Sequence, residues 1–115
     1  MIARMWRAIA ADGKLDAYLK HFSEQVLPEL KKCDGFASAI LLTPEVDGEN
    51  EITVTTFWQS TDAIDAFAGS DREAAVVAPE AAALLKTFDL RVRHYTVDLA
   101  ANPESISAYP GRSYN

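Results

Sequence analysis

The chain carries few side chains that could do chemistry, and a histidine near its end is the first of them. His94 lies in an apolar stretch with Leu90 and Val92. The imidazole ring exchanges protons near neutral pH, so His94 is the candidate general base if a cavity lies beside it. A structural histidine is the more common alternative, because no carboxylate partner stands at a diagnostic spacing.

Two tryptophans and a set of arginines could bind a ligand. Indole rings of Trp6 and Trp58 facing one cavity would stack on a flat aromatic molecule. The alternatives are a core position for Trp58 and a subunit interface for Trp6. Arginines on the first and last predicted strands could hold an anionic group, with Arg7 as the candidate substrate contact, or could form ion pairs. This set comprises Arg4, Arg7, Arg91 and Arg93.

The other reactive side chains have simpler explanations. Cys33, the only cysteine, follows two lysines near the C-terminal end of a predicted helix, which is the wrong end to activate a thiolate. We expect Tyr18 in the core and His21 in solvent. One cysteine and two histidines are too few for a soft-metal site, so the sequence predicts no metal.

Length and charge restrict the class of protein. A chain of 115 residues suits one domain. The formal net charge of −6 repels phosphate backbones, which argues against nucleic acid as a partner. No apolar run approaches the roughly 20 residues that span a bilayer, and the first residues do not resemble a secretory signal. We therefore expect a cytoplasmic protein without membrane contact.

Periodicity places four strands with helices between them. Apolar residues at spacings of three and four predict a helix that ends at Gly35, with a kink or restart at Pro28. A second helix runs from Ser60 through Phe67. The pair Ser70 and Glu73 has the form of a capping box that opens another short helix, and the segment PEAAALLKTF adds a further turn or two. The predicted strands cover residues 2–9, 36–43, 51–58 and 90–98.

The order of elements is β-α-β-β-α-β, which predicts an α+β, ferredoxin-like fold. In that fold two helices pack on one face of a four-stranded antiparallel sheet. The strands offer apolar groups to both faces, so we expect the uncovered face to pair with a second copy in a homodimer. Residues 1–100 form the predicted domain. Residues 101–115 are expected to be a tail that is either mobile or draped on a neighbour.

Several segments together resemble the antibiotic biosynthesis monooxygenase domain family of the dimeric α+β barrel superfamily. The most telling are PELKKCDGF at the exit of the first helix and FWQSTDAI at the end of the third strand. The resemblance covers roughly residues 2–98 and implies a dimeric α+β barrel. It also places Trp58 at the cleft between sheet and helices.

The resemblance implies a function that the residues alone do not. It favours a monooxygenase-like protein that needs no cofactor and acts on a small aromatic or quinone-type compound. Haem degraders of the superfamily use an asparagine on the first strand and a histidine after the third. This chain has neither residue at the corresponding position, so haem degradation is not expected. The alternative is a non-catalytic dimeric module that binds a hydrophobic ligand or has a stress-related role.

Overall fold

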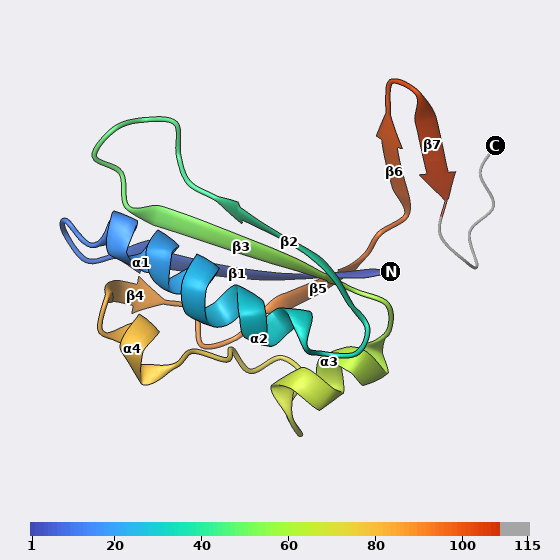
Figure 1. The fold of residues 1–115 in the computed structure, drawn as a ribbon, viewed down its shortest axis with the longest axis horizontal. Coiled ribbons are helices and arrows are strands. Elements are labelled where there is room, and N and C mark those ends of the chain that lie inside the picture. The colour runs from blue at the N-terminus through green and yellow to red at the C-terminus, as the bar shows by residue number, and fades with distance from the viewer. Residues whose placement is uncertain (109–115) are drawn as a thin grey trace.

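The longest strand, β1, lies at the centre of an antiparallel sheet in the computed structural model of the chain (Figure 1). The structure describes the backbone of residues 1–108 and the side chains of residues 1–104. One edge of β1 pairs with β3, which pairs in turn with β2, and the other edge pairs with β4 and β5. These strands are β1 (Ile2–Ala10), β2 (Phe36–Leu42), β3 (Glu51–Trp58), β4 (Leu85–Phe88) and β5 (Arg93–Thr96).

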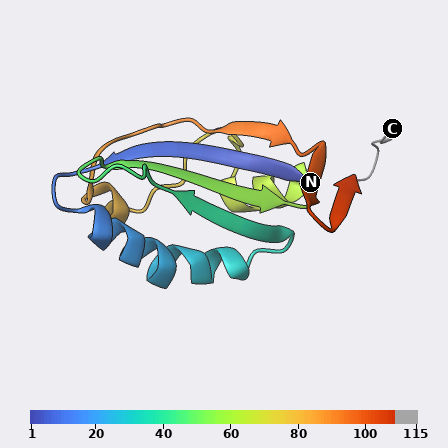
Figure 2. The ribbon, with the colours of Figure 1, turned by 90° about the horizontal axis from the view of Figure 1, so that it is seen from above.

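All helices lie on one face of this sheet (Figure 2). The predicted restart at Pro28 is confirmed. The helix widens into a π-helical segment just before the proline, whose missing N–H removes one hydrogen bond of the regular ladder. The helical elements are α1 (Leu15–His21), the π-helical segment (Phe22–Val26), α2 (Leu27–Lys31), α3 (Thr61–Ala68) and α4 (Pro79–Ala82).

The segment after α3 differs from the prediction. No helix starts at Ser70, and residues 69–78 form a loop. The Asp71 carboxylate accepts the backbone N–H of Glu73 at 3.2 Å, and the Glu73 carboxylate binds Arg91 at 3.0 Å. Because Glu73 is engaged there, it does not close the predicted capping box.

The last strand of the sheet is shorter than predicted, and another short strand precedes it. The sequence predicts one strand over 90–98 and helical turns up to Phe88. The structure instead gives a single turn, α4, followed by the short strands β4 and β5 on the same edge of β1. Backbone pairing with β1 outweighs the helical propensity of Leu85–Phe88, because it gives that segment hydrogen bonds along the sheet edge. The predicted β-α-β-β-α-β order is otherwise confirmed.

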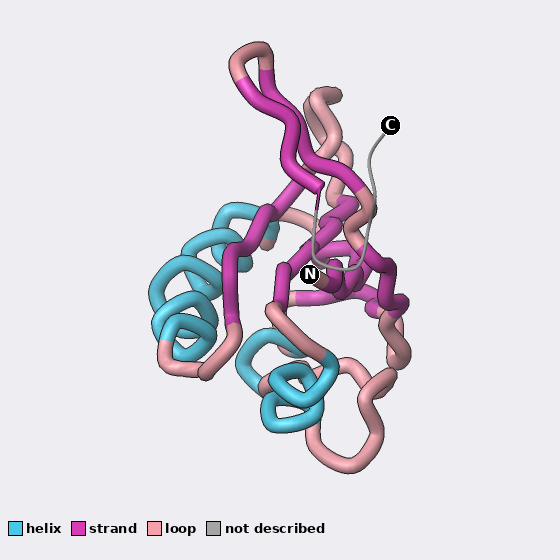
Figure 3. Tube along the Cα trace, turned by 90° about the vertical axis from the view of Figure 1, so that its right-hand side faces the viewer, coloured by secondary structure: helices cyan, strands magenta, loops and turns pink. Residues whose placement is uncertain are grey.

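A hairpin that the sequence did not predict follows the sheet. Strands β6 (Leu99–Asn102) and β7 (Ser105–Ala108) pair with each other and stand off the main sheet (Figures 1 and 3). The side chains of β6 are exposed. The hairpin therefore straddles the predicted boundary at residue 100, and the rest of the predicted tail, residues 109–115, lies outside the described residues.

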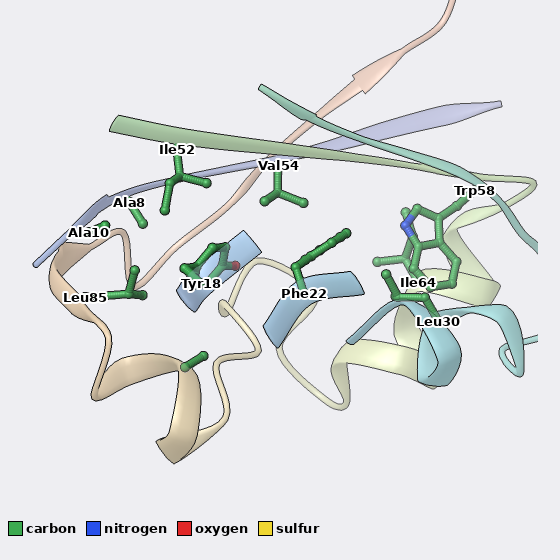
Figure 4. Packing of buried hydrophobic residues seen from close by; sticks show 11 residues of the cluster. Ala8, Ala10, Tyr18, Phe22, Leu30, Ile52, Val54, Trp58, Ile64 and Leu85 are labelled. Carbon is green, nitrogen blue, oxygen red and sulfur yellow. The ribbon is translucent and has the colours of Figure 1, made fainter. Parts of the chain in front are cut away.

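The two faces of the sheet have different environments. One face packs against the helices around Trp58, Ile52 and Ile64, none of which is accessible to solvent (Figure 4). On the opposite face, which we call the open face, none of the described residues forms a helix. A large apolar side chain such as Ile40 is 47% exposed there. The helix side is therefore the side of the sheet that the described helices enclose.

Gly35 sets the approach of β2 to α3, and this gives a stability prediction. Its φ is +85°, and an added Cβ would lie 2.5 Å from the Cβ of Ala63. Gly13 has a similar φ of +73° with nothing within 4 Å. We expect Gly13→Ala to cost about 1 to 2 kcal/mol of unfolding free energy and Gly35→Ala at least about 1 kcal/mol more. Urea denaturation measures both, and equal losses would contradict the close packing.

Candidate functional site

A cavity of about 90 Å³ lies between the helices and the sheet. Its walls are mainly apolar and aromatic, and its polar side chains are few. The helix side contributes Tyr18, His21 and Phe22, and the sheet contributes Arg4, Trp6 and Thr56. The loop before α4 closes a third side with Val76 and Val77. An apolar cavity with a few converging polar groups is the usual form of a small-molecule site.

Arg4 is the most unusual side chain of this cavity, because it is charged and only 5% exposed. Its Nη1 donates to the carbonyl of Arg72, and its Nη2 donates to the carbonyl of Ala74 at 2.8 Å. The guanidinium carbon also lies 5.7 Å from the centre of the Phe67 ring. These contacts join β1 to the loop 69–78 and fix the guanidinium at the cavity wall.

The charge of Arg4 has no ionic partner among the side chains that the structure describes. Acidic residues of α3 and of the nearby loop are bound by other arginines. Asp65 accepts two hydrogen bonds of 2.8 Å from Arg72, and Asp71 accepts one of 2.6 Å from Arg91. Burial lowers the pKa of Arg4 from its ordinary value, yet an arginine remains charged at physiological pH. A buried positive charge without a counter-ion favours an anionic ligand.

His94 lies beside Arg4 rather than in the cavity wall. The two residues are paired across β1 and β5, and the Nε2 of His94 is 3.1 Å from Nη1 of Arg4. A guanidinium has only donors, so this ring nitrogen accepts the hydrogen bond. Burial, and then the positive charge of Arg4, lower the pKa of His94. His94 is therefore placed to orient Arg4.

The two tryptophans are in different surroundings. Trp6 lines the cavity, and its Nε1 donates to the carbonyl of Asp89 at 2.9 Å. Trp58 has no accessible surface and packs against Phe36 and Phe67, with ring centroids 5.5 and 5.2 Å away. Its Nε1 donates to the hydroxyl of Thr56, a residue of the cavity wall. Trp58 thus supports the wall from behind.

Arg7 is separated from the cavity by the sheet. Alternation along β1 turns Arg4 and Trp6 toward the helices and Arg7 toward the open face, where it is exposed. It lines a separate pocket of about 300 Å³ together with Arg93 and Tyr95. Of the predicted substrate contacts, the structure brings only Trp6 into the cavity wall.

Sequence reasoning underestimated Arg4 and His21. We expected His21 in solvent, but its Nε2 is buried, has no hydrogen-bond partner among the described residues, and belongs to a ring that lines the cavity. A usable signal was present in both cases. Arg4 shares the face of β1 that carries Trp6, and His21 follows the core residue Tyr18 by one helical turn.

Two other kinds of site are not found in the part of the chain that the structure describes. No three histidine, cysteine, aspartate or glutamate side chains gather there in a way that could hold a metal ion. None of its helices has the length and apolar character that crossing a bilayer requires.

Tyr18 gives a prediction about alkaline stability. Burial raises the pKa of its hydroxyl to about 12. The unfolded chain ionises this phenol near pH 10, so Tyr18 stabilises the fold fully below about pH 10, and this contribution is lost as pH rises toward 12. Between about pH 9 and pH 12 the unfolding free energy of the wild type should fall because Tyr18 ionises more easily in the unfolded chain. Tyr18→Phe has no such group, so its unfolding free energy should fall by roughly 2 kcal/mol less over the same range. Urea denaturation across that range is the measurement, and parallel curves would contradict the assignment.

Comparison with solved structures shows that this fold is shared by proteins of different activity. The cofactor-independent oxygenase SnoaB from Streptomyces nogalater is 16% identical, with a TM-score of 0.63 over 89% of this chain and 96% of that chain. The haem-degrader MhuD from Mycobacterium tuberculosis is 22% identical, with a TM-score of 0.59 over 89% and 100%. Protein SO0527 from Shewanella oneidensis is 17% identical, with a TM-score of 0.63 over 82% and 87%. At these identities the likeness shows the fold alone.

The family is shown by the sequence match. A comparison with curated proteins finds no match. The family model described as antibiotic biosynthesis monooxygenase matches residues 1–79, which is more than half of the chain and includes β1, α1, α2, β2, β3 and α3. The chain therefore belongs to the antibiotic biosynthesis monooxygenase family.

Proposed function

We propose that the protein is a cofactor-independent monooxygenase acting on a small aromatic or quinol-type compound bound in the cavity. The observation that carries the proposal is the buried guanidinium of Arg4, which lacks an ionic partner and lies in the wall of an apolar cavity. Such a site would stabilise a phenolate or enolate, because charge interactions are strong where water is excluded. Membership of the family and the shared fold with SnoaB support this class of reaction.

The chemistry needs only the substrate, dioxygen and a dry, positively charged site. A phenolate is rich enough in electrons to reduce dioxygen directly. For a phenol with a free ring position, phenol plus dioxygen gives quinone plus water. One oxygen atom enters the ring and the other leaves as water, so no external reductant is required. In this scheme Arg4 holds the substrate oxygen, His94 orients Arg4, and Trp6 forms a wall for the ring.

The volume of the cavity restricts the ligand. An engineered apolar cavity of about 150 Å³ is known to hold benzene. The cavity here measures about 90 Å³, so one aromatic ring is the largest unit that fits after a modest outward movement of its wall. Haem is much larger than this space, and the residues present do not fit it. We therefore derive no haem chemistry for this chain, despite the shared fold with MhuD.

The small volume also favours a second candidate function, that of a non-catalytic module binding a small hydrophobic ligand. Most of the wall is apolar, and among the described residues that line it Arg4 is the one with a permanent charge. In this alternative Arg4 has a structural role, which is to tie the loop 69–78 to the sheet. The two functions differ in whether bound phenols are consumed with dioxygen.

Oxygen uptake with single-ring phenols and quinols tests the proposed activity. We expect Arg4→Gln to lower kcat/KM by roughly 100-fold or more, because the loss of a single anion-stabilising donor has effects of that size. Arg4→Lys keeps the charge but not the planar fork, so it should recover part of the rate. Circular dichroism checks that each variant is folded.

Arg7→Gln is the matched control for Arg4→Gln. It removes the same charge from the same strand but on the open face, and we expect it to retain the rate. Equal losses in the Arg4 and Arg7 variants would contradict the choice of site. Phenol binding without oxygen uptake by the wild type would favour the binding module.

We also propose that the protein is a homodimer formed through the open face. Four large side chains of that face are 42–53% exposed, although they lie on regular strands. Apolar groups gathered on one flat face are typical of an interface. A second copy offers the same face, so an isologous pairing would cover both at once. The four side chains are those of Ile9, Ile40, Leu42 and Tyr95.

Light scattering at micromolar concentration tests the assembly. We expect a dimer for the wild type and a dissociation constant at least about 10-fold higher for Ile40→Glu, because its carboxylate would lose water in the interface. Val46→Glu places the same charge at a side chain that is 62% exposed in the loop between β2 and β3, and it should leave the mass unchanged. A monomeric wild type would overturn the proposal.

A further inference from the structure

Apart from the indole of Trp6, whose N–H is bound to Asp89, four polar side chains stand among the described residues that line the cavity, and their chemistry can be separated. These are Arg4, Tyr18, His21 and Thr56. Arg4 carries a positive charge and can only donate. Burial raises the pKa of Tyr18 to about 12, so its hydroxyl stays protonated. The hydroxyl oxygen of Thr56 already accepts a hydrogen bond of 2.9 Å from Trp58. His21 is left as the one wall residue that can accept a proton.

The position of His21 fits that role. It ends α1 on the helix side of the cavity, while Arg4 lies across from it on the sheet. Its Nε2 is buried and finds no partner among the described residues. Buried polar atoms are normally hydrogen-bonded, and the exceptions need an explanation. A small rotation of the ring, which lines the cavity, would turn Nε2 toward it, and a ligand hydroxyl would then supply the missing partner.

His94 is less suited to be the base. Its Nε2 is occupied by the hydrogen bond from Arg4, and its ring does not line the cavity. Protonating that nitrogen would place a second positive charge 3.1 Å from the guanidinium and break the contact. His21 has no such conflict among its contacts with the described residues, since its ring neighbour is the aromatic ring of Tyr18, with centroids 6.2 Å apart.

We propose that His21 is the proton acceptor of the cavity and that the ligand enters as a neutral single-ring phenol. The O–H bond of the phenol breaks, its electron pair stays on oxygen, and a new N–H bond forms on Nε2, directly or through one water. The products are a phenolate, held by Arg4, and an imidazolium. Nothing is oxidised or reduced in this step. The inference rests on the proposed function, because it assumes that the cavity binds phenols.

The apolar wall explains why the base lies inside. A phenolate would have to shed its water to enter so apolar a cavity, whereas the neutral phenol loses much less hydration. Once inside, the proton moves to His21 and the new negative charge meets the guanidinium. The charge is therefore created only where Arg4 can stabilise it.

The chromogenic phenol 4-nitrophenol is a direct probe, because its neutral and anionic forms differ in colour. At a pH below the pKa of the free probe, we expect wild-type protein to bind it and turn it into the anion. We expect His21→Gln to bind the probe, measured by calorimetry, with at least about 10-fold less of it ionised. Lys20→Gln, which alters an exposed neighbour on the same helix, should behave as the wild type.

The outcomes separate the two proposals. If His21→Gln binds the probe and ionises it as fully as the wild type, the role of His21 is overturned while the proposed function stands. If His94→Gln binds the probe without ionising it, while His21→Gln still ionises it, the base is His94. If the wild type does not bind the probe, the proposed function and this inference both fail.

A measurement on unmodified protein covers the case in which the His21 variant does not fold. Nuclear magnetic resonance of isotope-labelled histidine distinguishes a protonated ring nitrogen from an unprotonated one. Addition of 4-nitrophenol should convert one of the two histidine rings to the imidazolium. The Lys20→Gln spectrum, which should shift only the neighbouring signal, assigns that ring to His21. No change at His21 on binding would overturn the inference.

Discussion

The buried guanidinium of Arg4 connects the parts of the chain that make the site. It starts from the central strand, donates to the carbonyls of Arg72 and Ala74, contacts His94, and lies against the ring of Phe67. A charge in so dry a place is costly unless its donors are used. The loop 69–78 therefore takes the path that brings its carbonyls to Arg4, and the cavity wall that follows is a consequence of that path.

Charge pairing around the loop leaves Arg4 available. The exposed arginines Arg72 and Arg91 bind the carboxylates of Asp65, Asp71 and Glu73. Each of these surface pairs contributes little to stability. Their effect on the site is larger, because they occupy the acids that could otherwise neutralise the buried guanidinium. An anionic ligand is then the natural counter-ion.

The two faces of the sheet differ in what they can bind. The helix side encloses the cavity, and its packing around Trp58 keeps the wall rigid. The open face carries exposed apolar side chains beside Arg7 and Arg93, and none of the described helices covers it. Pairing with a second copy and binding a small molecule would thus use opposite faces of the same sheet. Dimer formation would therefore not require a change in the cavity, and ligand binding would not require a change in the dimer interface.

The sequence by itself determined the α+β class, the strands β1, β2 and β3, and the restart at Pro28, because these depend on local periodicity and on the covalent limits of proline. It also placed Arg4 on the same strand face as Trp6. Only the tertiary structure decided that β4 replaces a predicted helix, that Arg7 lies away from the cavity, and that Trp58 is sealed in the core. It alone brought His21, Arg4 and the loop 69–78 around one space. Contacts between distant segments depend on which buried charges and which sheet edges are paired in the folded chain. A local sequence pattern does not contain that information.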